Sequence, residues 1–91
     1  MIIAKVIGNV VATKKDERLV GCKLLIIQPL DLDNTLVDRA PRVAVDIVGA
    51  GMGETVLVVE GSSARLALDK ADIPIDAAVV GIVDTMEVQG Q

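Results

Sequence analysis

The fold is decided by a stretch near the middle of the chain, Val43-Ala44-Val45-Asp46-Ile47-Val48-Gly49-Ala50-Gly51-Met52-Gly53-Glu54-Thr55-Val56-Leu57-Val58-Val59. Two runs of mostly β-branched apolar residues flank a loop that holds three glycines within five residues. Chains place glycine where the backbone needs a positive φ or where another backbone comes very close. The stretch predicts two strands joined by a tight bend that a phosphate, a substrate or another copy of the chain approaches.

Length and composition predict one small domain, residues 1–91, with more apolar surface than it can bury. Of the 91 residues 52% are hydrophobic and none is aromatic, so the core must be aliphatic. A chain of this length buries only about 60–65% of its unfolded surface when it folds alone. We therefore expect other subunits to cover the surplus, although single Val and Ala side chains on a monomer surface are the ordinary alternative.

Charge and cysteine content limit the classes of partner and the cellular location that are expected for the chain. Nine Lys and Arg against 13 Asp and Glu give a net charge of −4, which argues against nucleic acid or an anionic membrane as the main partner. No apolar run approaches the ~18 residues of a membrane helix, and the first residues show no signal peptide. The single Cys22 predicts a cytoplasmic chain without disulfides.

Periodicity predicts five strands, at residues 2–12, 23–28, 42–48, 55–60 and 77–84, and one short helix at 64–70 capped by Ser62 or Ser63. Gly8 within the first strand suggests a bulge or a sharp curl. The connections at 13–21 and 30–41 are charged and are expected to be solvated. Five short strands predict an all-β fold, a small OB-like barrel. OB modules that bind single strands use aromatic platforms and a positive groove, and this chain has neither.

The motifs argue against a calcium site and against a hydrolase. Asp31-x-Asp33 begins like a calcium loop, but Leu36 and Arg42 stand where that loop needs Gly and Glu. The chain has no His and no Gly-x-Ser-x-Gly around its serines, which argues against a hydrolase. We predict neither a metal nor another cofactor, and no catalytic residue.

The glycine-rich loop lends itself to one further alternative, a small ligand- or nucleotide-binding barrel that uses residues 49–53. Phosphate-cradling loops lead from a strand into a helix and are followed by Lys-Ser/Thr, whereas this loop leads from a strand into a strand. Asp46, on an otherwise apolar strand, needs hydrogen-bond donors if it points inward, and the backbone N–H groups of the following loop are the simplest source.

With these parts in place, nearly the whole chain resembles the EutN/CcmL family, the vertex proteins of bacterial microcompartment shells. Five blocks in the right order carry the resemblance. They are Val6-x-Gly8 with Val10-Val11-Ala12-Thr13-x-Lys15, Leu19-x-Gly21-x-Lys23-Leu24-Leu25, Val43-Ala44-Val45-Asp46-x-Val48-Gly49-Ala50-Gly51-x-Gly53-Glu54, Gly61-Ser62-Ser63-Ala64-Arg65, and Asp76-x-Ala78-Val79-Val80-Gly81-Ile82-Val83-Asp84.

The resemblance implies an OB-like barrel that assembles into a homopentamer and caps the fivefold vertices of a shell. It further implies packing among hexameric shell proteins and no catalysis by the pentamer itself. A fivefold ring needs a head-to-tail interface that closes, which the surplus apolar surface can supply. On this interpretation the candidate site is a structural corner that lets neighbouring subunits pack closely. Its residues are Asp46, Gly49, Ala50, Gly51, Gly53 and Glu54.

Overall fold

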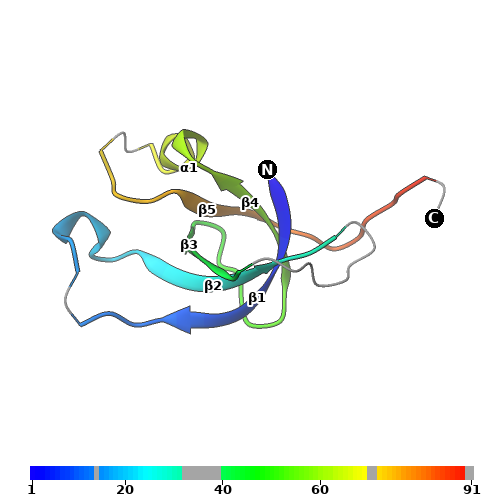
Figure 1. Cartoon of the computed structure of the whole chain (residues 1–91), viewed down its shortest axis with the longest axis horizontal. Helices are drawn as coiled ribbons and strands as arrows, with labels where there is room; N and C mark the ends of the chain where they lie inside the picture. Colours follow the sequence, from blue (N-terminus) through cyan, green and yellow to red (C-terminus); the bar gives the residue numbers. More distant parts are fainter. Residues whose placement is uncertain (14, 32–39, 70–71, 90–91) are drawn as a thin grey trace.

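The structure, a computed structural model, describes residues 1–13, 15–31, 40–69 and 72–89 (Figure 1). Within these residues lie five strands, one short α-helix and one 3₁₀ turn. Their bounds are β1 Ile2–Val10, η1 Glu17–Leu19, β2 Lys23–Pro29, β3 Arg42–Asp46, β4 Thr55–Glu60, α1 Ser62–Ala67 and β5 Ala77–Ile82.

The strands close into a barrel in the order β1-β2-β3-β5-β4, with β4 returning to pair with β1. Neighbouring strands are antiparallel except β3 and β5, which run parallel and are joined only at Val45↔Ala78 and Asp46↔Val79. The arrangement confirms the predicted all-β, OB-like five-stranded barrel. The helix α1 packs against β4 and β5 (Figure 1).

The barrel bends at a β-bulge in β1, as Gly8 predicted. The pairing of β1 with β2 shifts register between Val6 and Gly8, so that Ile7 has no partner of its own on β2. A Cβ atom at Gly8 would lie 3.2 Å from Cδ1 of Ile26, which is tighter than ordinary contact. The bulge adds curvature that a short sheet needs in order to close.

The core lies inside the barrel and is built from one face of every strand. Residues at alternating positions are buried, as expected for strands with one face turned inward. All of these residues are small or aliphatic. They fill the interior of the narrow barrel without an aromatic side chain. The cluster comprises Ala4, Val6, Leu25, Ile27, Ala44, Ala50, Val56, Val58, Ala77 and Val79.

Four strand ends differ from the predicted ones, and one element is displaced. β2 continues to Pro29 rather than ending at residue 28. β1 stops at Val10 rather than residue 12, β3 stops at Asp46 rather than residue 48, and β5 stops at Ile82 rather than residue 84. The helix spans Ser62–Ala67 rather than 64–70, so it begins two residues earlier. The predicted surface loop at 30–41 falls largely outside the described residues. In the part of the chain that the structure describes, no helix has the length and apolar character needed to cross a membrane.

Candidate functional site: the corner between β3 and β4

The corner loop, residues 47–54, connects β3 to β4 and begins at a carboxylate that faces back onto it. Oδ1 of Asp46 accepts hydrogen bonds from the backbone N–H groups of Val48 and Gly49, each at 3.1 Å. The Asp46 side chain is only 1% exposed. The backbone turns out of the sheet here because the side chain takes donors that a continuing strand would offer to its neighbours. The donors are those expected from the sequence.

Lys23, at the start of β2, joins the same carboxylate to the loop. Its Nζ atom lies 3.5 Å from Oδ2 of Asp46 and donates to the carbonyl of Ala50 at 2.8 Å. Lys23 and Asp46 are register partners across β2 and β3, which places the two side chains together. Sequence reasoning missed this contact. The signal that finds it is the antiparallel pairing of two strands, with a charge of opposite sign at each partner position.

Glu54 closes the other end of the corner loop. Its Oε1 atom accepts from the N–H of Gly51 at 2.5 Å, and its own N–H donates to the Gly51 carbonyl at 3.2 Å. Its carbonyl in turn accepts from the N–H of Val6 at 2.9 Å, while Gly53 donates to the Val6 carbonyl at 2.8 Å. The loop is therefore attached to β1 on one side and to β2, through Lys23, on the other.

Glycine stands at positions 49, 51 and 53 of the corner for different physical reasons. Gly49 and Gly53 have φ values of +81° and +83°, in the left-handed region that side chains with a Cβ atom disfavour. Gly51 has no such φ, but a Cβ atom there would lie 3.3 Å from Oε1 of Glu54. Ala50 is fully buried in the core cluster. These local reasons account for the glycine-rich pattern within a single subunit, before any neighbour is considered.

The corner offers little to a phosphate or another anion. The N–H groups of Val48, Gly49, Gly51 and Gly53 already donate to acceptors within the chain. Two carboxylates face the loop, and the nearest cation is paired with one of them. An anion binds where N–H groups are free and point at it. Among the described residues, no group of three His, Cys, Asp or Glu side chains is placed to hold a metal ion.

The two serines after β4 are not the helix cap that the sequence predicted. Gly61 occupies the N-cap position of α1 with φ +66°, no side chain caps the helix, and Ser62 and Ser63 are its first two residues. The prediction was wrong because Gly61 makes the turn out of β4 itself and donates its N–H to the carbonyl of Asp76 at 2.8 Å. Arg65 then joins the helix to the next connection by donating to the Ile75 carbonyl at 2.9 Å.

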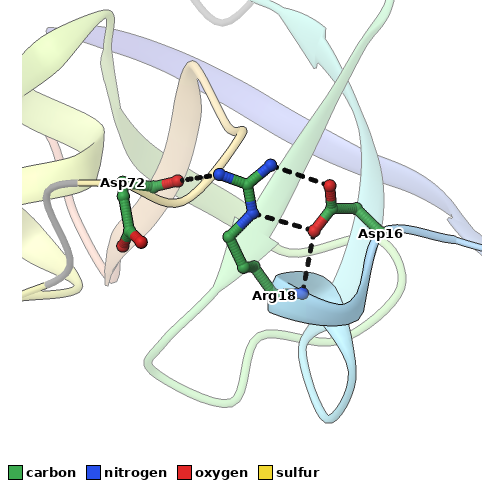
Figure 2. Close-up of polar contacts among 3 residues, drawn as sticks. All are labelled: Asp16, Arg18 and Asp72. Carbon is green, nitrogen blue, oxygen red and sulfur yellow. Dashed lines mark hydrogen bonds and ion pairs between the residues drawn. The ribbon is translucent and has the colours of Figure 1, made fainter.

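A second polar cluster, in the connection predicted to be merely solvated, was also missed. Arg18 donates from Nε and one terminal nitrogen to the two carboxylate oxygens of Asp16, at 2.9 and 2.8 Å (Figure 2). Its other terminal nitrogen donates to the Asp72 carbonyl at 2.6 Å, across 54 residues of sequence. The carboxylate of Asp16 also accepts from the Arg18 N–H and caps η1. The local Asp-x-Arg pair is visible in the sequence, whereas its contact with Asp72 is not.

Large apolar side chains remain exposed outside the barrel in several parts of the chain. Ile7 and Val11 are exposed at and beyond the end of β1, and Val11 is 87% exposed. Others follow β3 and the corner loop, where Met52 is 65% exposed. The second group comprises Val43, Ile47, Val48 and Met52. Exposed apolar side chains are the kind of surface that contacts with other chains cover.

The fold and this corner together define a small, closed OB-like barrel with a braced loop between β3 and β4, and comparison with known proteins gives the family. The chain matches, over residues 1–84, the sequence model of the family described as ethanolamine utilisation protein EutN/carboxysome. It belongs to the EutN/CcmL family. It is 53% identical over 87 residues to the bacterial microcompartment shell vertex protein GrpN of Rhodospirillum rubrum, which covers 96% of this chain and 97% of that relative. It is 50% identical over 88 residues to the carboxysome shell vertex protein CcmL of a Synechocystis strain, covering 97% of this chain and 87% of the relative.

Solved structures of relatives share the fold along the whole chain. The pentameric microcompartment shell protein GrpN from Rhodospirillum rubrum superposes with a TM-score of 0.87 at 50% identity, covering 97% of this chain and 99% of that one. The structure of CcmL from Gloeobacter violaceus gives a TM-score of 0.90 at 40% identity, covering 98% and 91% of the two chains.

Proposed function

We propose that this chain forms a homopentamer that caps the vertices of a bacterial microcompartment shell in the cytoplasm, where it packs among hexameric shell proteins. The observation that carries the proposal is the likeness to the pentameric GrpN shell protein, which extends over nearly all of both chains. Half of the aligned residues are identical, which supports the same assembly for this chain.

The role is structural rather than catalytic. The polar groups of the corner bind one another and hold β3 and β4 against β1 and β2, so they brace the barrel. The apolar side chains outside the barrel supply the contacts between subunits. The alternative of a ligand- or nucleotide-binding barrel gains no support from the corner, where the N–H groups of Val48, Gly49, Gly51 and Gly53 already donate to acceptors within the chain.

Size-exclusion chromatography with light scattering tests the oligomeric state. We expect a mass of about 48 kDa, five times the chain mass of 9.5 kDa. A stable monomer at micromolar concentration would refute the proposal. A thermal shift series with nucleotides and inorganic phosphate runs beside it, and a ring-forming protein should show no response.

Co-expression with a hexameric shell protein tests the place in the shell. Hexagonal sheets are flat, and a closed particle needs fivefold positions. With this chain present we expect closed polyhedral particles in electron micrographs, and the chain should co-purify with them. Recovery of free pentamer beside open sheets or tubes would contradict the proposed partner.

A further inference from the structure

The segment after β5, residues 84–89 (the arm), leaves the barrel and extends from one end of the molecule (Figure 1). The last hydrogen bond between this part of the chain and the barrel is donated by Val83 to the Thr55 carbonyl at 2.9 Å. Within the described residues, no hydrogen bond joins the arm to its own barrel. The molecule is 46 Å long, against 23 and 22 Å in the other directions. A projecting terminal segment keeps one conformation only where something holds it.

The arm has the pattern of an extended segment that lies on an apolar surface. Its sequence is Asp84-Thr85-Met86-Glu87-Val88-Gln89. In an extended chain alternate side chains share a face, so Met86 and Val88, which are half-buried, lie on one face and the exposed Glu87 lies on the other. Asp84 and Glu87 make the arm acidic. The surface that binds the arm should therefore combine apolar side chains with a cation.

The end of β1 is such a surface. Along its edge facing β4, β1 is paired over Ile2–Lys5, and the corner loop continues the contact to Val6. From Ile7 to Val10 this edge has no strand partner among the described residues. Ile7 and Val11, at either end of this stretch, are exposed. An unpaired strand edge flanked by exposed apolar side chains binds further chains, unless something covers it.

A hollow of about 250 Å³ lies beside this end of β1, between it and the start of β2. Val10, Val11, Cys22 and Leu24 contribute to its lining. Lys15 lies at the same hollow, and its Nζ donates to the Ala12 carbonyl at 3.2 Å. Within the described residues Lys15 forms no salt bridge. The hollow thus offers apolar walls and an ammonium group that, among the described residues, has no carboxylate partner.

We propose that the arm of one copy docks on the end of β1 of the next copy, with Met86 and Val88 on its apolar side chains and Glu87 towards Lys15. The inference rests on the proposed ring assembly and names the contact that links its subunits. The arm and the hairpin end of β1 point in opposite directions along the long axis of the molecule (Figure 1). The contact is therefore head-to-tail, the type that closes into a ring when the rotation permits. The match to the family model ends at residue 84, so residues 85–89 of the arm lie beyond that model.

A disulfide between copies tests the docking directly, because Cys22 already lies in the hollow. The variant Val88→Cys is assembled and oxidised with copper phenanthroline in air, which accepts the two electrons and two protons that the paired thiols lose. We expect a covalent ladder up to the pentamer in non-reducing electrophoresis. The matched control, Val88→Cys with Cys22→Ser, should give at most a dimer. A ladder that survives the loss of Cys22, or no ladder at all, would overturn the inference.

Charge exchange supplies a second test that does not depend on oxidation. Glu87→Lys and Lys15→Glu should each weaken the ring about tenfold per contact, and the double variant should recover most of the loss. The charge change Lys5→Glu, at an exposed residue that does not line the hollow, serves as the control. The chain truncated after Val83 separates this inference from the proposed function. If wild type is a pentamer and the truncated chain has the same dissociation constant, the docked arm is wrong and the ring stands. If wild type is a monomer, both fail.

Discussion

At the scale of single residues, the carboxylate of Asp46 holds the start of the corner loop. It is buried, it accepts two backbone hydrogen bonds, and its charge faces Lys23. We expect Asp46→Ala to lower the free energy of unfolding by roughly 1–3 kcal/mol, since two N–H groups and an ammonium group lose their partner. Urea denaturation of the assembled protein measures the loss.

The isosteric variant Asp46→Asn separates the two contributions. Asn retains an oxygen that accepts from Val48 and Gly49, but it has no charge for Lys23. Its loss should be smaller than that of Asp46→Ala. Equal losses would mean that the ion pair carries the whole effect, and no loss in either variant would contradict the bracing role.

The corner glycines make a second prediction at this scale. Gly53 has φ +83° with nothing within 4 Å of an added Cβ atom, so Gly53→Ala tests backbone strain alone. We expect it to cost about 1–2 kcal/mol of folding stability. Gly51→Ala meets the Glu54 carboxylate at 3.3 Å, which a small side-chain movement relieves, and should cost less. The sequence alone suggested that glycine here serves close packing of subunits. If both variants fold normally and only the ring is weakened, that explanation holds instead.

Contacts between residues close together in the sequence were predictable, whereas contacts between residues far apart in the sequence were not. The donors to Asp46 come two and three residues later, so the loop composition was enough to expect them. Lys23 is contributed by another strand and meets Asp46 only through the register of β2 and β3. The same holds for Arg18, whose local partner is two residues away and whose distant partner is Asp72.

At the scale of elements, the strands were predictable and their ends were less so. All five strands follow from runs of mostly aliphatic and β-branched residues, and β4 has the predicted bounds. The ends of β3 and α1 were misplaced because a side chain and a glycine decide them. Asp46 removes donors from the sheet, and Gly61 turns the chain before either serine. The residue at which a strand or helix ends can depend on a single hydrogen bond or dihedral angle, which hydrophobic periodicity does not reveal.

The η1 turn makes a prediction about pH. Hydrogen bonds from Arg18 and its positive charge hold the pKa of Asp16 well below its usual range. A carboxyl group whose folded pKa is lowered contributes stability that is fully present above its unfolded pKa of about 3.9 and is lost as the pH falls towards the folded pKa. We expect the contribution of this cluster to be unchanged from pH 7 to 5 and to decrease below about pH 4.

Thermal unfolding of wild type and Asp16→Asn across this pH range measures that contribution. The difference between the two melting temperatures should be constant above pH 5 and become smaller in acid. The effect is modest because both side chains are well exposed and solvent screens their charges. A difference that stays constant down to about pH 2 would contradict the lowered pKa of Asp16.

At the scale of the whole molecule, the aliphatic composition has a direct thermodynamic consequence. The barrel interior is filled by small and branched side chains, and Val11, Met52 and Leu66 remain largely exposed. A core of this size leaves a single chain with a small margin of stability. Burial of the exposed apolar side chains between subunits adds to that margin, so folding and ring formation should be coupled.

Coupling of this kind makes the melting temperature depend on protein concentration. If a folded pentamer unfolds to five separate chains, each tenfold rise in chain concentration adds about 1 kcal/mol per chain to the apparent stability, by mass action. Differential scanning fluorimetry at chain concentrations from about 1 to about 100 micromolar should therefore show a steady rise in melting temperature. The chain truncated after Val83 should melt lower at every concentration, because its ring lacks one of its contacts. A melting temperature independent of concentration in wild type would mean that the barrel unfolds without dissociating or does not assemble. Light scattering at the same concentrations distinguishes those two cases.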